Sequence, residues 1–140
     1  MPFLVGALAS CSIPGPATSA DQIDGLKTET YRVGPPLDIT MFAQRAGDPV
    51  GRRVIFVHGT PGRSGAWSDY LANVPKGFEF VAIDRAGFGK SGPAGAVTSL
   101  KDQARTILPL LVDRGGGWPI LVGHSLGALT ALALARSAGS

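Results

Sequence analysis

Residues 119–137 read PILVGHSLGALTALALARS, and this stretch decides the fold. Its first five residues form a short apolar run, as expected of a strand buried on both faces of a parallel sheet. The residues from Leu126 onward are apolar nearly all round, which predicts a helix packed deep against that sheet. Ser125 stands between the two in a Gly-x-Ser-x-Gly pattern. We therefore expect Ser125 on a tight turn between a strand and a helix, the usual setting of a serine nucleophile.

Upstream of this stretch, the sequence predicts two more buried strands and two helices. The apolar runs VIFV at 54–57 and FEFVAID at 78–84 indicate the strands. The shorter helix is predicted by apolar residues at helical spacing: Trp67, Tyr70, Leu71 and Val74. The longer helix is expected to have Ser99 or Thr98 at its N-terminal cap and a kink at Pro109. It is predicted by a second stripe of apolar residues: Leu100, Ala104, Ile107, Leu108 and Leu111.

Two leading strands complete the predicted order of elements. TYRV at 30–33 and LDITMFAQ at 37–44 flank the turn-forming GPP, and the second run alternates apolar with polar residues. They are expected to form an antiparallel pair of half-buried strands. The rest of the chain then reads strand, helix, strand, helix, strand, helix. This order predicts an α/β fold, a three-layer sandwich around a mostly parallel sheet.

The composition is typical of a globular chain. Hydrophobic residues make up 44% of the 140 residues, and charged residues make up 16%. The net charge is +3, but the basic residues are scattered and form no cluster, which argues against nucleic acid as a partner. The single cysteine excludes an internal disulfide and a cysteine-based metal cluster. We expect no cofactor and no metal.

Residues 1–27 predict a signal-like or lipobox segment followed by a flexible tether. A mostly apolar run at 2–9 precedes Ser10 and Cys11, and LASC at 8–11 resembles a bacterial lipobox, whose cysteine is lipidated. This interpretation places the protein in the bacterial cell envelope or outside the cell, with a membrane tether at Cys11. No Lys or Arg precedes the apolar run, so the alternative is a cytoplasmic protein with a disordered tail and a chance cysteine.

The turn around Ser125 has the residues that a nucleophile needs. Gly123 and Gly127 leave room for the turn and for close approach of strand and helix. At a helix N-terminus the free N–H groups favour a developing negative charge, and the N–H of Leu126 is expected to point at it. His124 is expected to point to the opposite side of the strand, into packing.

The loop HGTPG, residues 58–62, follows the first buried strand and supplies a second donor. Its backbone N–H at Thr60 is expected to face the same oxyanion, with Gly59 and Gly62 giving flexibility and Pro61 fixing the loop. His58 is interpreted as a structural residue that shapes this loop; a role as catalytic base is the alternative.

A third glycine-rich loop, DRAGFGKSG at 84–92, imitates a phosphate-binding loop. The phosphate-binding pattern Gly-x-x-x-x-Gly-Lys-Ser/Thr needs glycine where this sequence has Asp84, and a carboxylate there would repel phosphate. Nucleotide binding is therefore not expected. Asp84 is interpreted as a side chain that fixes its loop by accepting backbone N–H bonds, with triad acid as the weaker alternative.

Three segments, VIFVHGTPG, VAIDRAGFGKSG and ILVGHSLGALTALALA, occur in an order and spacing that resemble the N-terminal half of an α/β-hydrolase fold enzyme. The resemblance spans residues 28–140 and implies that Ser125 is the nucleophile, with Thr60 and Leu126 as backbone oxyanion donors. HGTPG is similar to the His-Gly-x-Pro loop of esterases, epoxide hydrolases, dehalogenases and prolyl aminopeptidases. Dehalogenases and epoxide hydrolases have aspartate at the nucleophile position, so Ser125 argues against those two activities.

The resemblance also implies parts of an active site that the sequence does not contain. The triad of this family runs serine, acid, histidine along the chain, yet none of the 15 residues after Ser125 is His, Asp or Glu. The strand at 119–123 is expected to be left as an unpaired apolar edge, prone to association. We expect a truncated serine hydrolase that acts on small acyl substrates and is inactive by itself. The sequence does not indicate its oligomeric state. The alternative is a non-catalytic, envelope-tethered remnant that binds or assembles.

Overall fold

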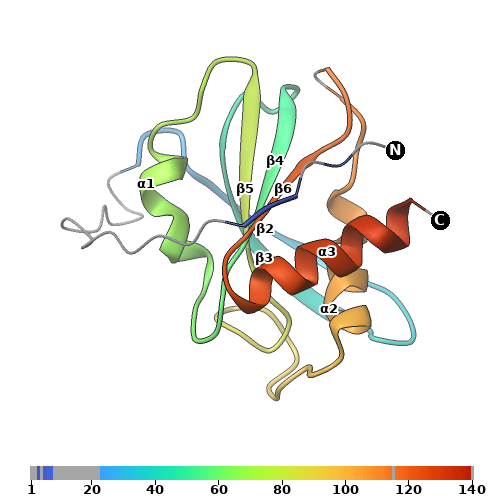
Figure 1. Ribbon diagram of the computed structural model, residues 1–140. Coiled ribbons are helices and arrows are strands. Elements are labelled where there is room, and N and C mark those ends of the chain that lie inside the picture. Colours follow the sequence, from blue (N-terminus) through green and yellow to red (C-terminus); the bar gives the residue numbers. More distant parts are fainter. Residues whose placement is uncertain (1–2, 4, 8–22, 115, 140) are drawn as a thin grey trace.

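The computed structural model describes residues 3, 5–7, 23–114 and 116–139. They form one six-stranded sheet in the order β1-β6-β4-β5-β3-β2 (Figure 1). The strands are β1 (Val5–Ala7), β2 (Lys27–Val33), β3 (Ile39–Gly47), β4 (Arg52–Val57), β5 (Phe78–Asp84) and β6 (Ile120–Gly123). The helices are η2 (Ser64–Trp67), α1 (Ser68–Leu71), α2 (Leu100–Ile107), η3 (Leu108–Leu110) and α3 (Leu126–Ala138), of which η2 and η3 are 3-10 turns.

The middle of the sheet is parallel, as the sequence predicts. Strand β4 pairs in parallel with both β5 and β6, while β3 runs antiparallel to β5 and to β2. The carboxyl ends of β4, β5 and β6 therefore lie at one edge of the sheet, where an open α/β sheet places its binding site. The three loops singled out in the sequence all begin there.

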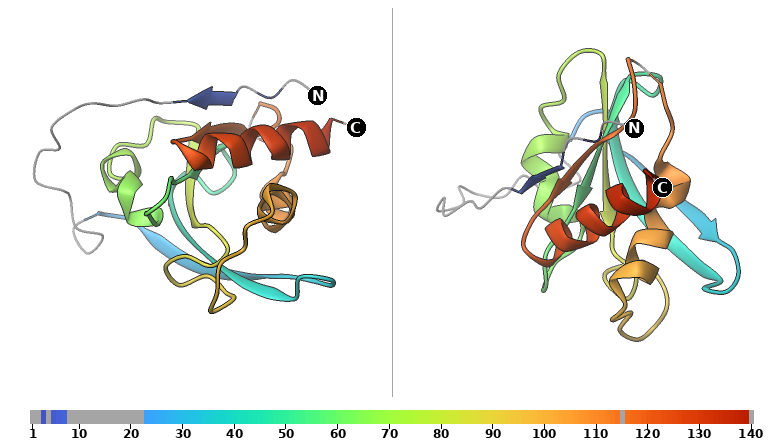
Figure 2. Two further views of the ribbon diagram at one scale, coloured as in Figure 1. Left: turned by 60° about the horizontal axis from the view of Figure 1, so that its bottom comes forward. Right: turned by 45° about the vertical axis from the view of Figure 1, so that its right-hand side comes forward.

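Successive side chains of β4 point to opposite faces of the sheet, and each face carries one of the two cores of a three-layer sandwich. Ile55 and Val57 pack into the core beneath α2 and α3, whereas Val54 and Phe56 pack into the core beneath η2 and α1. Figure 2 shows α2 and α3 side by side on one face, with α1 set apart from them. The predicted α/β class is confirmed.

The two predicted helices form with changed lengths. Ser99 caps α2, its Oγ accepting the Asp102 N–H at 3.2 Å, as predicted. Helix α2 ends at Ile107 and tightens into η3 because Pro109 lacks the N–H that would continue the α-helical ladder. The helix predicted at 67–74 is shorter, with a single turn after η2.

Helix α3 packs against the sheet, as predicted, but through one face only. Leu126, Leu129 and Leu132 are 38%, 51% and 49% exposed. Helix α3 meets the sheet through the opposite face, where Ala131 and Leu134 are fully buried. An apolar composition alone does not say which faces of a helix have neighbours.

The prediction that the last strand is an unpaired edge is wrong. Val5–Ala7 pairs in parallel with the outer edge of β6, with Val5 opposite Leu121 and Ala7 opposite Gly123. Ile23 is buried in the core beside α1, and β2 begins at Lys27. Cys11 and its lipobox lie outside the described residues. Within the described part of the chain, no helix is long and apolar enough to span a membrane.

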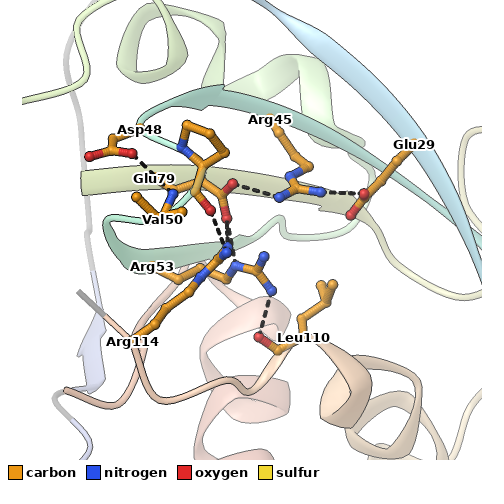
Figure 3. Close-up of polar contacts among 9 residues, drawn as sticks. Glu29, Arg45, Asp48, Val50, Arg53, Glu79, Leu110 and Arg114 are labelled. Carbon is orange, nitrogen blue, oxygen red and sulfur yellow. Dashed lines mark hydrogen bonds and ion pairs between the residues drawn. The ribbon is translucent and has the colours of Figure 1, made fainter. Parts of the chain in front are cut away.

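An ion-pair cluster ties β3, β4 and β5 together at the edge opposite the three loops (Figure 3). The buried Glu79 carboxylate accepts hydrogen bonds from Arg45 at 2.6 Å, from Arg53 at 2.7 Å and from Arg114. Arg45 also pairs with Glu29 on the neighbouring strand β2. Charges buried this well need such partners, so the cluster fixes the starts of the central strands.

Candidate active site

Ser125 occupies a strained backbone position at the start of α3. Its φ of 54° and ψ of −124° lie in a region of backbone conformation that residues other than glycine rarely adopt. Serine at this place usually caps the helix with its hydroxyl, but Ser125 makes no capping hydrogen bond. The residue is exposed to solvent. A strained, uncapped and accessible hydroxyl at a helix N-terminus has the properties of a nucleophile.

The two flanking glycines are required by close backbone contacts. A Cβ on Gly127 would lie 2.2 Å from the Val57 carbonyl oxygen, at the end of β4. A Cβ on Gly123 would lie 2.5 Å from the Ala128 Cα. The His124 N–H donates to the same Val57 carbonyl at 3.1 Å. The turn that carries Ser125 is thus pressed against the end of the central strand.

The loop after β4 lies directly against this turn. A Cβ on Gly59 would approach the Ser125 Cβ to 3.1 Å, so a side chain there would crowd Ser125. Within the described part of the chain, the backbone N–H groups of Thr60 and Leu126 form no hydrogen bond. Two free donors beside one serine match the arrangement that stabilises a developing oxyanion.

His58 is committed to the structure of that loop. Its Nε2 accepts the Arg85 N–H at 2.9 Å, and its Nδ1 bonds to the Gly59 carbonyl at 2.7 Å, which assigns the proton to Nδ1. The ring is buried, and this burial lowers the pKa of His58 below its ordinary value. Both nitrogens are therefore occupied in a neutral ring. The interpretation of His58 as a loop-shaping residue is supported, and the alternative of a base is not.

Arg85 holds the same loop and was not singled out in the sequence. Its side chain is 1% exposed; Nε donates to the His58 carbonyl at 2.8 Å and Nη2 to the Gly59 carbonyl at 3.1 Å. Nη2 also reaches the Thr60 hydroxyl, and the guanidinium stacks on Phe88 at 4.5 Å. The available signal was a cation directly after a buried strand, where it must find partners.

Asp84 fixes the third loop, as predicted. Its carboxylate is 2% exposed and accepts the Ser64 N–H at 2.6 Å and the Lys90 N–H at 2.8 Å. The N–H of Lys90 in a true phosphate-binding loop would face a phosphate, and here it faces Asp84. A Cβ on Gly89 would lie 2.2 Å from the same carboxylate. The Asp84 carboxylate is thus bonded to backbone N–H groups of neighbouring loops, and it is not available to orient a histidine.

A pocket of about 320 Å³ opens beside the turn. Its lining includes the aromatic rings of Trp67 and Tyr70, together with Gly59, Pro61 and His124. The prediction that His124 points into packing is wrong, because the side chain is exposed and lines this pocket. Its strand ends one residue earlier, so the alternation of a strand no longer governs it. Within the described residues, no group of three or more His, Cys, Asp or Glu could hold a metal ion.

Comparison with known proteins identifies the family. A family model described as "Alpha/beta hydrolase family" matches residues 54–139, which include most of β4, the turn at Ser125 and all of α3. This chain belongs to the alpha/beta hydrolase family. Hydrolase chemistry is therefore supported at the family level.

The curated relatives of this hydrolase chain are much longer than the chain itself. A non-heme chloroperoxidase of Kitasatospora aureofaciens is 38% identical over 78 residues, which cover 55% of this chain and 28% of that protein. The lipase LipV of Mycobacterium tuberculosis is 30% identical over 99 residues, covering 71% of this chain and 37% of the lipase. The chain therefore spans about a third of the length of these relatives.

Solved structures agree with this hydrolase fold. The haloalkane dehalogenase DbeA of Bradyrhizobium elkani superposes with a TM-score of 0.66 at 25% identity, covering 80% of this chain and 38% of that one. An epoxide hydrolase of Vigna radiata gives a TM-score of 0.64 at 22% identity, covering 81% and 36% of the two chains. The second likeness shows the fold alone.

Proposed function

We propose that Ser125 is the nucleophile of a serine hydrolase that acts on carboxylic esters or related acyl substrates. The observation that carries this proposal is the state of Ser125: positive φ, exposed, and without a capping hydrogen bond. A backbone strained by about 1–3 kcal/mol persists only where the surrounding structure enforces it. Here the glycines on both sides and the end of β4 enforce it.

The proposed reaction follows from the groups around Ser125. The hydroxyl oxygen attacks the substrate carbonyl carbon, and the electron pair of the carbonyl moves to its oxygen. The hydroxyl proton passes to a general base, which returns it to the departing alcohol. The N–H groups of Thr60 and Leu126 then hold this oxyanion. Loss of the alcohol leaves an acyl-enzyme on Ser125, and water releases the acid in the second step.

We further propose that the base which activates Ser125 lies outside these 140 residues. The two ring nitrogens of His58 are bonded to backbone groups, and the Asp84 carboxylate is occupied by two N–H groups. Loss of the histidine from such a triad lowers the rate by several orders of magnitude. We therefore expect the 140-residue chain to hydrolyse a p-nitrophenyl ester no faster than its Ser125→Ala variant.

Labelling with a fluorophosphonate in the presence of imidazole tests both parts of the proposal. Imidazole supplies the base from solution, so the labelling rate at Ser125 should rise with imidazole concentration, as followed by mass spectrometry of the labelled peptide. Ser137 on the same helix is the internal control, because its hydroxyl bonds to the Ala133 carbonyl in an ordinary helical turn. Equal labelling of Ser125 and Ser137 would contradict the nucleophile assignment. Ester turnover that needs both Ser125 and His124 would contradict the external base.

A further inference from the structure

The pocket beside the Ser125 turn contains an aromatic surface that is anchored in the core. Trp67 at the end of η2 and Tyr70 in α1 both line the pocket. Trp67 is 5% exposed, and its ring lies 5.0 Å from the ring of the buried Phe56. Tyr70 is 44% exposed, and its ring contacts those of Phe56 and Trp67 at centroid distances of 5.5 Å and 5.6 Å. The Tyr70 ring is therefore accessible and yet fixed in place by its neighbours.

The lining of the pocket favours an aromatic ligand over an aliphatic one. Among the described residues, the lining contains no Leu, Ile, Val or Met, and its aliphatic side chains are those of Pro61 and Ala66. Aromatic rings prefer to meet other rings edge-to-face or in offset stacks, at centroid distances of about 4.5–7 Å. A ring bound beside Tyr70 would extend the ring contacts that already exist there. A volume of about 320 Å³ suits one ring with a short linker.

The charges around the pocket argue against a cationic ligand. Aromatic rings also attract ammonium groups. Within the part of the chain that the structure describes, however, neither Asp nor Glu belongs to the lining. The Arg85 guanidinium donates to the carbonyl of the lining residue Gly59 at 3.1 Å, and its charge would repel a cation. We therefore expect an uncharged ring.

The pocket also lies next to the reacting group of the proposed hydrolase. Gly59 lines the pocket, and a Cβ on Gly59 would lie 3.1 Å from the Ser125 Cβ. It would lie 3.0 Å from Nδ1 of His124, which lines the pocket as well. A substrate whose carbonyl carbon meets the Ser125 hydroxyl would thus find room for a substituent a few bonds away.

We propose that this pocket binds an uncharged aromatic ring of the substrate, and that Tyr70 determines this preference. The inference rests on the proposed function, which places the substrate carbonyl at Ser125. Tyr70 is the determining residue because its ring is accessible, whereas Trp67 is packed into the core. The substrate class is accordingly an ester or related acyl compound with an aryl group close to its carbonyl.

Three amides test the preference for a ring and the side of the carbonyl that carries it. N-methyl-2-phenylacetamide has its ring on the acyl side, and its isomer N-benzylacetamide has the ring on the leaving-group side. N-methyl-2-cyclohexylacetamide replaces the aromatic ring by a saturated one of similar size. Amides resist hydrolysis, so a titration measures binding alone. The readout is the indole N–H signal of Trp67 in proton–nitrogen NMR, and the signal of Trp118, before the start of β6, is the internal reference.

Tyr70→Leu and Tyr70→Phe are the matched variants. Leucine keeps an apolar side chain without a ring, and phenylalanine keeps the ring without the hydroxyl. We expect the wild-type chain and Tyr70→Phe to bind at least one phenyl amide about three- to tenfold more tightly than the cyclohexyl amide. Tyr70→Leu should lose this preference and bind the cyclohexyl amide as the wild-type chain does. The phenyl isomer that binds more tightly identifies the side of the carbonyl that carries the ring.

Three results would overturn the proposal. Equal affinity of the wild-type chain for the three amides would mean an apolar pocket without preference for a ring. A preference that persists in Tyr70→Leu would mean that Tyr70 does not determine it. A titration that leaves the Trp67 signal unchanged would mean that no ring binds in this pocket. Far-UV circular dichroism establishes that both variants are folded. The amide titrations do not involve attack by Ser125, so their failure is distinct from a failure of fluorophosphonate labelling.

Discussion

Replacing Ser125 by glycine should stabilise this protein relative to replacing it by alanine. Alanine keeps the Cβ that makes φ 54° and ψ −124° unfavourable, and glycine removes it. Relief of the strain contributes about 1–3 kcal/mol to the free energy of unfolding. The greater freedom of glycine in the unfolded chain takes back about 0.5–1 kcal/mol. Both variants lose the same hydroxyl, so we expect the free energy of unfolding of Ser125→Gly to exceed that of Ser125→Ala by up to about 2.5 kcal/mol.

Urea unfolding followed by tryptophan fluorescence measures this difference, since Trp67 is buried in the core. Ser137 provides a control of opposite sign, because it lies in the last turn of α3, where the backbone is helical. There, glycine should be less stable than alanine by up to about 1 kcal/mol, the penalty of a helix interior. If glycine were equal to or less stable than alanine at position 125 as well, the turn would store no strain. The structural argument for a nucleophile at Ser125 would then fail.

Two further predictions concern buried charge. Glu79→Gln should lower the free energy of unfolding by about 3–5 kcal/mol, because it leaves the Arg53 side chain, which is 7% exposed, without a counter-charge. Glu29→Gln should lower it by about 1 kcal/mol or less, because the Glu29 side chain is 30% exposed. Similar losses in the two urea titrations would refute the role of the cluster. Burial lowers the pKa of His58 in the folded protein. Below about pH 6.5, the imidazole of the unfolded chain therefore binds a proton more readily than that of the folded chain. Stability should therefore fall below that pH by up to about 1.4 kcal/mol per pH unit. In NMR titrations, the His58 ring of the folded protein should gain its proton at a lower pH than the ring of the unfolded chain. Protonation at the same or a higher pH would disprove this.

The elements around the site could be predicted because their signals are local. Buried strands at 54–57 and 78–84 and the helix cap at Ser99 each follow from a few adjacent residues. The turn at Ser125 is predicted by glycines whose absent side chains make room for the backbone. Asp84 is similar, because a carboxylate at the start of a glycine-rich loop finds the N–H groups of that loop.

What could not be predicted depends on partners distant in the sequence. Residues 5–7 pair with a strand more than a hundred positions away, and no pattern within three residues indicates that partner. The exposure of Leu129 and the position of His124 likewise depend on which segments surround α3 and the pocket. Arg85 belongs to no periodic pattern in the sequence. Its importance lies in four contacts with a loop about 26 residues earlier.

The contacts of Arg85 explain how the backbone groups proposed to hold the oxyanion are kept in place. An oxyanion site stabilises charge only if its donors are held in place before the reaction, since reorienting them during catalysis would cost the energy that they supply. Thr60 is held through its hydroxyl and the Gly59 carbonyl by Arg85, and Leu126 is held by the turn that Val57 supports. All of these groups come from β4, β5 and β6, whose relative positions the sheet fixes. The donors therefore need no further residues to be in position, whereas the proposed base must be brought to Ser125 by residues beyond these strands.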